Sequence, residues 1–456
     1  MLNNHYRNLL FLCIFSVLYA LFFINIYQYP ILGDERTYYA YGVNLYKGNG
    51  YSYQEFPPFI QSNLREPAYP LFIYGLFKIF GVSKGVIQIS QAILNGIIVL
   101  VTYSLASLVF DNKKIALTAA FLTAVSPAIA GYAALITSET LAAVYLILML
   151  LSFLALLKER KSTRAIGHSI LTGLFCGCLV LTKIAYLFFA PLICLALFIM
   201  SAGKFIKYKA VLCIAIFFIG ALLPWLSFNN RVYGNPFFLT NRGGITTTMK
   251  AERLNWTFKE ALVSFVYPIS EELVKRYLPH EYKKVTYNPV VGSAFKAAYD
   301  RYDSLISHGY SEMAADRQLR LEAWKKIKKN IFKYSILSIS DLHFMIYFEG
   351  MPLSQFTEFF KRKTRGAINF VFKIYSLIIV FFAVKGIFVI IRNRKNRPIK
   401  VLFLLPVFYT FLIYSAIFGA PRFTFTIIPL IYILASVSIC GMIKPKIHIR
   451  DQKAII

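Results

Sequence analysis

Long runs of hydrophobic residues recur along this chain, and short polar segments separate them. An α-helix needs about 17 to 25 residues to cross the hydrocarbon core of a membrane, and about ten runs come near that length. They lie at 8–28, 85–110, 113–132, 139–157, 168–182, 185–202, 208–227, 367–391, 399–418 and 422–442. The polar pair Thr182-Lys183 divides two short runs, so we expect a tight helical hairpin there. The pattern predicts an all-α, multi-pass membrane protein.

Lysine and arginine residues follow alternate runs. Because such residues in short loops are retained on the cytoplasmic side, their positions predict the orientation of the helices. They are Arg7, Lys113, Lys114, Lys158, Arg160, Lys161, Arg164, Lys204, Lys207, Lys209, Arg392, Arg394, Lys395, Arg397, Lys444, Lys446 and Arg450. With an even number of spans, both termini are expected to be cytoplasmic. The first run has no small-residue cleavage site after it, so we interpret it as a retained helix.

One long polar segment, 229–366, interrupts the hydrophobic pattern. It is expected on the external face, together with the first loop at 29–84. We therefore divide the chain into three parts: an N-terminal transmembrane module at 1–228 that includes this loop, a mainly helical external domain at 229–366, and C-terminal transmembrane helices with a cytoplasmic tail at 367–456. The external domain is thus inserted before the last three of about ten transmembrane helices.

The composition supports this class of protein. A chain of 456 residues that is 57% hydrophobic and 17% aromatic is too apolar for a soluble protein of this length. The formal net charge of +29 is mostly carried by residues that set orientation and contact anionic lipid, so we expect membrane lipids and no nucleic acid as partners. The six cysteines lie in apolar runs, the six histidines lack ligand spacing, and no glycine-rich phosphate loop is present. A disulfide framework, a zinc site and a nucleotide-driven pump are therefore not predicted.

Polar residues gather at the external ends of the predicted helices. Asp34 and Glu35 directly follow the first run, where charge near hydrocarbon is rare and usually functional. Glu139 opens the fourth run, and Lys183 follows the fifth. Other polar positions at this face are Arg65 in the stretch Arg65-Glu66-Pro67-Ala68-Tyr69-Pro70, Arg231 beyond Pro224-Trp225, and Arg422 in the last external turn. These groups would converge if the helices pack as one bundle.

The order of these motifs resembles that of the membrane-embedded glycosyltransferases of the GT-C fold that use a polyprenyl-phosphate sugar. The branch in question contains the protein O-mannosyltransferases (glycosyltransferase family 39) and the lipid A aminoarabinose transferases. In that family an Asp-Glu pair opens the first external loop, and an Arg/Lys-Pro-x-x-Tyr-Pro-like stretch follows. An acidic residue opens the fourth span, and Leu-Thr-Lys/Arg ends the fifth. The family's Arg-Asn-like residues after Pro-Trp read Asn229-Asn230-Arg231 here, so their order is altered.

The resemblance covers most of the chain and implies a GT-C-like bundle. It also implies transfer of a sugar from a polyprenyl-phosphate donor to a hydroxyl or phosphate of a glycolipid, cell-wall polymer or protein. Transfer in one displacement would invert the anomeric centre. The enzyme would lie in the plasma (inner) membrane with its active site facing the periplasm or exterior.

Such a reaction needs a base and cations. A positioned carboxylate that takes the acceptor's proton contributes about 10²- to 10⁴-fold, and Asp34 is the candidate, with Glu35 and Glu139 as further catalytic acids. Cationic side chains would hold the donor phosphate, and the candidates are Arg65, Lys183, Arg231 and Arg422. Tyr38, Tyr39 and Tyr69 are candidates for contact with sugar or acceptor. No cofactor is obligatory, although the three acids could bind a divalent cation.

Each residue also has a structural explanation. Asp34 and Glu35 could stabilise a helix N-terminus by about 0.3 to 1 kcal/mol. Glu139 could cap its helix, Lys183 could snorkel to the interface, and the arginines could be interfacial anchors. A transporter or flippase for a lipid-linked sugar is the alternative function, but we see neither internal repeats nor ionisable groups deep in the spans. An oligosaccharyltransferase should carry a Trp-Trp-Asp-Tyr-Gly stretch, which this sequence lacks.

Overall fold

The computed structural model describes residues 4–27, 30–159, 161–200, 205–286, 293–348, 362–392 and 397–442, which are helices joined by turns and loops without a β-strand. The α-helices are α1 (Asn4–Ile26), α2 (Asp34–Lys47), α3 (Ala68–Phe80), α4 (Lys84–Phe110), α5 (Lys113–Ala124), α6 (Pro127–Tyr132), α7 (Glu139–Lys158), α8 (Ser162–Val180), α9 (Phe189–Met200), α10 (Phe205–Tyr233), α11 (Gly243–Glu252), α12 (Phe258–Val266), α13 (Glu271–Tyr277), α14 (Pro279–Val285), α15 (Ser293–Ser307), α16 (Glu312–Lys329), α17 (Ile331–Met345), α18 (Arg362–Arg392), α19 (Arg397–Ile417), α20 (Pro421–Thr424) and α21 (Ile428–Met442).

Within these ranges, seven helical segments are long and apolar enough to cross a membrane: α1, α4, α7, α8, α10, α18, and α20 with α21. The remaining predicted runs correspond to α5 with α6 and to the shorter apolar helices α9 and α19. The prediction of an all-α multi-pass bundle is therefore confirmed. A short segment containing a 3-10 turn at Ile184–Tyr186 joins α8 to α9, at the place where we expected a tight hairpin.

The predicted run 113–132 is a broken helix rather than one span. The helix α5 ends at Ala124, and α6 begins at Pro127. Proline disfavours helical geometry in the residue before it, and here that residue is Ser126, whose backbone is extended. The Ser126 hydroxyl accepts a hydrogen bond from the backbone N–H of Ile129 at 3.2 Å and so caps α6. Hydropathy alone hid this break because both halves are apolar.

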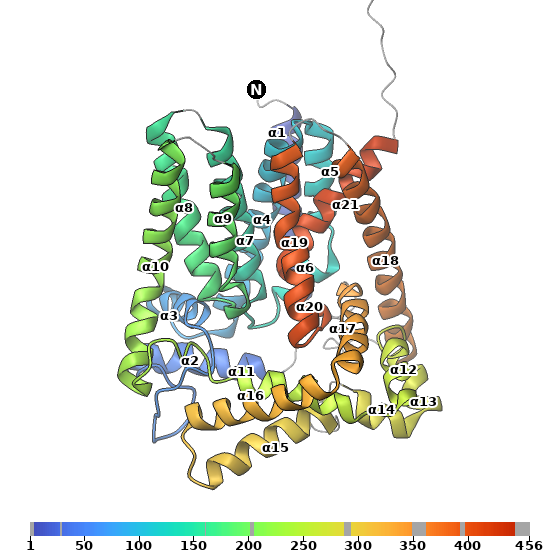
Figure 1. Cartoon of the computed structure of the whole chain (residues 1–456). Helices are drawn as coiled ribbons and strands as arrows, with labels where there is room; N and C mark the ends of the chain where they lie inside the picture. The colour runs from blue at the N-terminus through green and yellow to red at the C-terminus, as the bar shows by residue number, and fades with distance from the viewer. Residues whose placement is uncertain are drawn as a thin grey trace, which may run out of the picture.

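The long helices stand side by side, and the helices α2, α3 and α11–α17 gather at one end of them, as Figure 1 shows. The N-terminus of α1 lies at the opposite end. Of the candidate spans, α7 and the segment that contains α21 have the largest share of buried residues, whereas most residues of α1, α10 and α18 are not buried. Close packing depends on glycine at Gly173, where a Cβ would lie 2.6 Å from the backbone oxygen of Ile214 in α10.

The first loop packs firmly against the bundle. A buried cluster that includes Tyr38, Tyr69, Ile73 and Leu141 joins α2 and α3 to the start of α7. Further along the loop, the Asn63 amide donates to Asn229 of α10 at 3.1 Å. These contacts fix the first turn of α2 at the end of the bundle.

The helices α11–α17 build two small hydrophobic cores of their own. One buried carboxylate, Asp341 of α17, joins these helices to one another through Lys250 and Arg253, each at 2.6 Å. Lys250 also donates to the backbone oxygen of Ser415 in α19 at 2.9 Å. The proposed boundary at 366 adjoins residues 349–361, which lie outside the described part, as does the proposed tail after 442.

Candidate active site

Asp34 is the first residue of α2 and lies where four chain segments meet. Gly33 before it has a φ of 56°, which glycine adopts at little cost, and this turns the chain into the helix. The Asp34 carboxylate pairs with Arg65 from the loop before α3, and with Arg422 Nη1 of α20 at 2.8 Å. Arg242, just before α11, lies 3.9 Å away. Residues far apart in the sequence therefore converge on one carboxylate.

The positive charges around Asp34 outnumber its single negative charge. Burial opposes ionisation, but the positive charges of Arg65, Arg422 and Arg242 outweigh it, so the pKa of Asp34 lies well below its usual range. Burial also disfavours the charged form of Arg65, yet the neighbouring Asp34 raises the pKa of that guanidinium. Three arginines thus face one carboxylate, a formal excess of two positive charges. Such a centre attracts an anion.

A second ion pair lies next to this centre. Glu139 is the first residue of α7, and its carboxylate accepts from Lys183 Nζ at 2.8 Å in a largely buried position. The backbone N–H of Ala68 donates to the carbonyl oxygen of Leu181 at 2.9 Å. This bond ties the segment that carries Arg65 to the end of α8, two residues before Lys183.

Tyr38 connects the two charged groups. The Arg65 guanidinium lies over its ring, 4.9 Å from the centroid. Its hydroxyl is 3.2 Å from the Ser138 hydroxyl, one residue before Glu139. Arg422 in turn interacts electrostatically with both Asp34 and Glu139. The two ion pairs therefore form one continuous polar cluster at the end of the bundle.

Glu35 points away from its neighbour Asp34, because successive side chains of a helix are about 100° apart. Its carboxylate accepts hydrogen bonds from the Tyr27 hydroxyl at 2.7 Å and from the backbone N–H of Ile136 at 3.0 Å. Burial raises the pKa of Glu35, although these two bonds oppose the shift. Glu35 thus fastens α2 to the end of α1 and to the turn before α7.

Of the other predicted residues, Tyr69 touches this cluster, because its ring packs edge-on against that of Tyr38 with the centroids 5.0 Å apart. Tyr39 packs edge-on against Phe77 of α3, with the ring centroids 5.7 Å apart. Tyr69 is fully buried, and its hydroxyl donates to Gln91 at 2.8 Å. Arg231 is exposed on α10 and makes no ion pair with the described residues. The structure therefore brings together Asp34, Arg65, Arg422, Glu139, Lys183 and Tyr38.

Arg242 was not predicted from the sequence. Besides facing Asp34, its guanidinium donates to the Tyr299 hydroxyl at 3.2 Å, and its Nε is buried without a hydrogen bond. The nearby Gly244 packs closely on Asp316 and donates its N–H to that carboxylate at 2.5 Å. The Gly243-Gly244 pair was the local signal of this close approach, but nothing in it indicates that Arg242 turns toward α2.

No group of three or more histidine, cysteine, aspartate or glutamate side chains in the described ranges could hold a metal ion. Asp34 and Glu139 each face cationic side chains instead. The arginine and lysine side chains of this cluster can bind an anion, and its carboxylates can accept a proton.

Comparison with known proteins bears on the fold. A family model described as dolichyl-phosphate-mannose-protein mannosyltransferase matches residues 65–228, which include Arg65, Glu139 and Lys183. No curated protein sequence matches the chain. The archaeal oligosaccharyltransferase AglB from Archaeoglobus fulgidus, in complex with an inhibitory peptide and a dolichol-phosphate, matches with a TM-score of 0.54 and 14% identity over 96% of this chain and 50% of that one.

The apo form of the Archaeoglobus fulgidus oligosaccharyltransferase matches with a TM-score of 0.53 and 15% identity, over 96% of this chain and 50% of that one. Apo ArnT from Cupriavidus metallidurans matches with a TM-score of 0.42 and 11% identity, over 93% of this chain and 76% of that one. The chain thus spans about half the length of the two oligosaccharyltransferase structures. The resemblance inferred from the motifs is confirmed, and the chain has the GT-C fold of membrane-embedded glycosyltransferases.

Proposed function

We propose that this protein is an integral membrane glycosyltransferase that transfers a sugar from a polyprenyl-phosphate donor to an acceptor hydroxyl or phosphate. The observation that carries the proposal is the single carboxylate, Asp34, faced by three arginines at one end of the bundle. The description of the matching family model, dolichyl-phosphate-mannose-protein mannosyltransferase, supports the choice of donor.

The arginines would bind the donor phosphate. Guanidinium groups match phosphate oxygens in planar, two-point hydrogen bonds, and the excess of positive charge around Asp34 favours an anion there. Arg65, Arg422 and Arg242 are the proposed ligands, with Lys183 beside them. Arg231 remains a weaker candidate because its side chain is exposed and apart from the cluster.

Donor binding would also activate the base. While the arginines pair with Asp34, its pKa is low and it is a poor proton acceptor. A phosphate that takes over these arginines weakens their hold on Asp34, so its pKa rises and it can accept a proton. The acceptor oxygen then forms a bond to the anomeric carbon, the bond from that carbon to the phosphate oxygen breaks, and Asp34 takes the hydroxyl proton.

The leaving polyprenyl phosphate gains a negative charge, which the arginines stabilise. A single displacement of this kind inverts the anomeric centre. Glu139 would orient the acceptor and Tyr38 would contact the sugar, whereas the hydrogen bonds of Glu35 and Tyr69 favour supporting roles. No step in this scheme needs a cofactor.

The proposed setting is the plasma (inner) membrane, with the cluster at the periplasmic or external face and both termini cytoplasmic. The lysine and arginine residues in alternate loops support this orientation. The proposed parts 1–228, 229–366 and 367–456 would all contribute to the site, through Asp34, Arg242 and Arg422. A glycolipid, a cell-wall polymer or a protein is the proposed acceptor.

Transfer from a panel of radiolabelled polyprenyl-phosphate sugars by the protein purified in detergent tests the proposal. Asp34→Asn should lower kcat by about two orders of magnitude or more, since it removes the base. It also removes the negative charge that competes for the arginines, so the KM for the donor should fall. Arg65→Gln and Arg422→Gln should raise this KM instead. The exposed residues Asp300 and Arg276 supply matched control variants, Asp300→Asn and Arg276→Gln.

Unchanged transfer by folded Asp34→Asn would reject Asp34 as the base. A failure of the wild-type protein to transfer from any donor, combined with movement of a lipid-linked sugar across vesicle membranes, would reject the glycosyltransferase and support the flippase alternative.

A further inference from the structure

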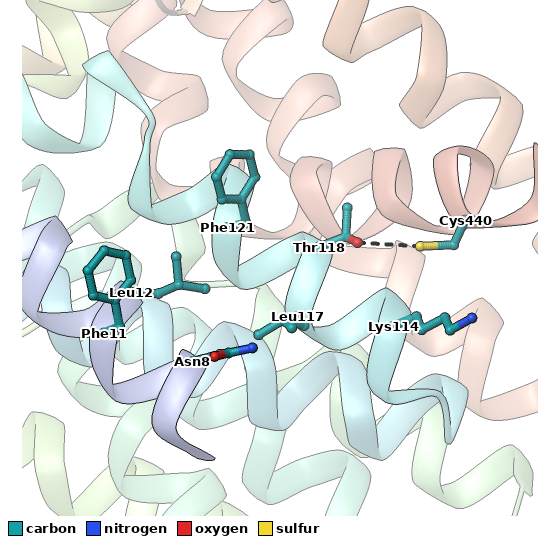
Figure 2. Close-up of a pocket in the computed structure, with 8 residues that line it drawn as sticks. All are labelled: Asn8, Phe11, Leu12, Lys114, Leu117, Thr118, Phe121 and Cys440. Carbon is teal, nitrogen blue, oxygen red and sulfur yellow. Dashed lines mark hydrogen bonds between the residues drawn. The ribbon is translucent and has the colours of Figure 1, made fainter. Parts of the chain in front are cut away.

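A groove of about 500 Å³ lies between α1, α5 and α21, at the opposite end of the bundle from α2, which begins with Asp34. Figure 2 shows the side chains that line it: Asn8, Leu117 and Lys114 lie in the lower part of the view, with Leu117 between the two polar side chains, and the phenyl rings of Phe11 and Phe121 lie above them. The hydroxyl of Thr118 and the thiol of Cys440 form a hydrogen bond of 3.4 Å at its wall. The groove is at the end of the bundle where α1 begins.

Polarity changes along the groove in one direction. Lys114 is in the first turn of α5, and Phe121 lies seven residues further on, which corresponds to about 10 Å along a helix. On α1, Asn8 comes before Phe11 and Leu12. Polar groups therefore stand at one end of the groove, and aromatic and aliphatic groups line the rest of it, where the side chains of Phe11 and Phe121 are exposed on the surface of the bundle. This is the polarity of a membrane lipid, whose charged headgroup joins hydrocarbon chains.

The polar end of the groove is suited to a negative headgroup. The side chains of Lys114 and Asn8 are exposed and form no hydrogen bond or ion pair with other described residues. The helices α1 and α5 both begin near this end, so their N-termini add partial positive charge. The backbone N–H groups of Lys114 and Ile115 are already capped by Asn112, which leaves headgroup binding to side chains.

We propose that this groove binds one anionic phospholipid of the surrounding bilayer. Its phosphate would be held by the ammonium of Lys114 and the amide of Asn8, and an acyl chain would lie along Phe11 and Phe121. The lipid would bridge α1, α5 and α21, so it would stabilise the packing of these helices. The inference does not depend on the proposed transfer reaction, because the groove is separate from the arginine cluster.

Native mass spectrometry of the delipidated protein in detergent tests this inference, with phosphatidylglycerol and phosphatidylcholine as the two probes. We expect one phosphatidylglycerol to bind in preference to phosphatidylcholine. Lys114→Gln should weaken phosphatidylglycerol binding about fivefold, the effect of one lysine near an anionic lipid. Lys113→Gln is the matched control, because Lys113 is exposed in the same turn but does not line the groove.

A second variant tests the role of the Asn8 amide in headgroup binding. Asn8→Leu removes the amide with little change in size, and it should reduce the preference for phosphatidylglycerol without loss of the folded protein. Equal binding of both phospholipids would overturn the inference, as would equal effects of Lys113→Gln and Lys114→Gln. Displacement of phosphatidylglycerol by polyprenyl phosphate at equal concentration would overturn it too, since the groove would then belong to the polyprenyl lipid.

Discussion

Asp341→Asn should destabilise the protein strongly, because Asp341 is a fully buried carboxylate that neutralises two buried cations. Its oxygens lie 2.6 Å from Lys250 Nζ and 2.6 Å from Arg253 Nη1. Removing one partner of a buried ion pair leaves an uncompensated charge and costs about 3 to 5 kcal/mol. Two cations lose their partner here, but burial already lowers the pKa of Lys250 to about 8. Without Asp341 this lysine sheds its proton near neutral pH, so the loss should stay near about 3 to 5 kcal/mol rather than double.

Thermal unfolding in detergent, followed by tryptophan fluorescence, measures this loss. Trp256 is a suitable reporter because the Arg253 guanidinium lies 4.8 Å from the centroid of its ring. At about 2 to 4 °C per kcal/mol for a large cooperative unit, the melting temperature should fall by on the order of 10 °C. The control is Asp300→Asn, which breaks an exposed pair of 3.8 Å and should change stability by less than about 1 kcal/mol.

A rescue experiment separates lost charge balance from lost packing. Lys250→Met removes one of the two cations, while Arg253 still pairs with Asp341, so alone it should destabilise less than Asp341→Asn. Added to Asp341→Asn, it should restore part of the lost stability, because the free-energy cost of deprotonating Lys250 below its ordinary pKa of 10.5 disappears. Melting of Asp341→Asn at the temperature of the Asp300→Asn control would refute the reasoning, and so would a double variant that is no more stable than Asp341→Asn.

Three further predictions concern pH, packing and the first loop. The pKa of Lys250 is about 8 in the folded protein, below its ordinary value of 10.5, so between these two pH values the unfolded chain binds more protons than the folded one. The contribution of Lys250 to the free energy of unfolding should therefore rise as the pH increases from 8 to 10. Melting curves of the wild type and of Lys250→Met over this pH range check the difference. Gly386→Ala should destabilise the chain because a Cβ would collide with the backbone of Leu434, whereas Gly220→Ala meets open space; detergent melting temperatures compare the two. Glu35→Gln should cost about 1 to 3 kcal/mol, since an amide nitrogen replaces an oxygen that accepts a buried hydrogen bond; the same melts measure it, and an unchanged melting temperature would contradict the bonding described for Glu35.

The membrane-spanning helices could be predicted from the sequence, because a helix that crosses the hydrocarbon core needs about 20 consecutive apolar residues. Part of the candidate site could also be predicted from the positions of the helix ends. Asp34, Glu139 and Lys183 stand at helix ends on the same face, and a bundle of alternating helices brings such ends together. Arg422 belongs to the same class, because it opens the last span. Their pairing followed from topology rather than from any single motif.

Two features could not be predicted in this way. Asp34 and Glu35 are adjacent acids at a helix start, and only the packing of α2 decides which carboxylate meets arginines and which meets Tyr27. Arg242 lies in a segment without hydropathic periodicity. Its position depends on how α11 packs against α16, including the hydrogen bond from Gly244 to Asp316. Contacts between segments this distant leave no pattern in a single sequence.

The helix α11 connects the arginine cluster at Asp34 to the buried ion pairs at Asp341. Arg242 precedes its first residue and faces Asp34, while Lys250 in its last turn pairs with Asp341. A helix of 10 residues is about 15 Å long, so α11 acts as a short rigid spacer between these carboxylates. Because Lys250 also holds the end of α19 through Ser415, the same anchor fixes the turn that leads to Arg422. The buried centre at Asp341 therefore positions two of the three arginines around Asp34, although it touches neither.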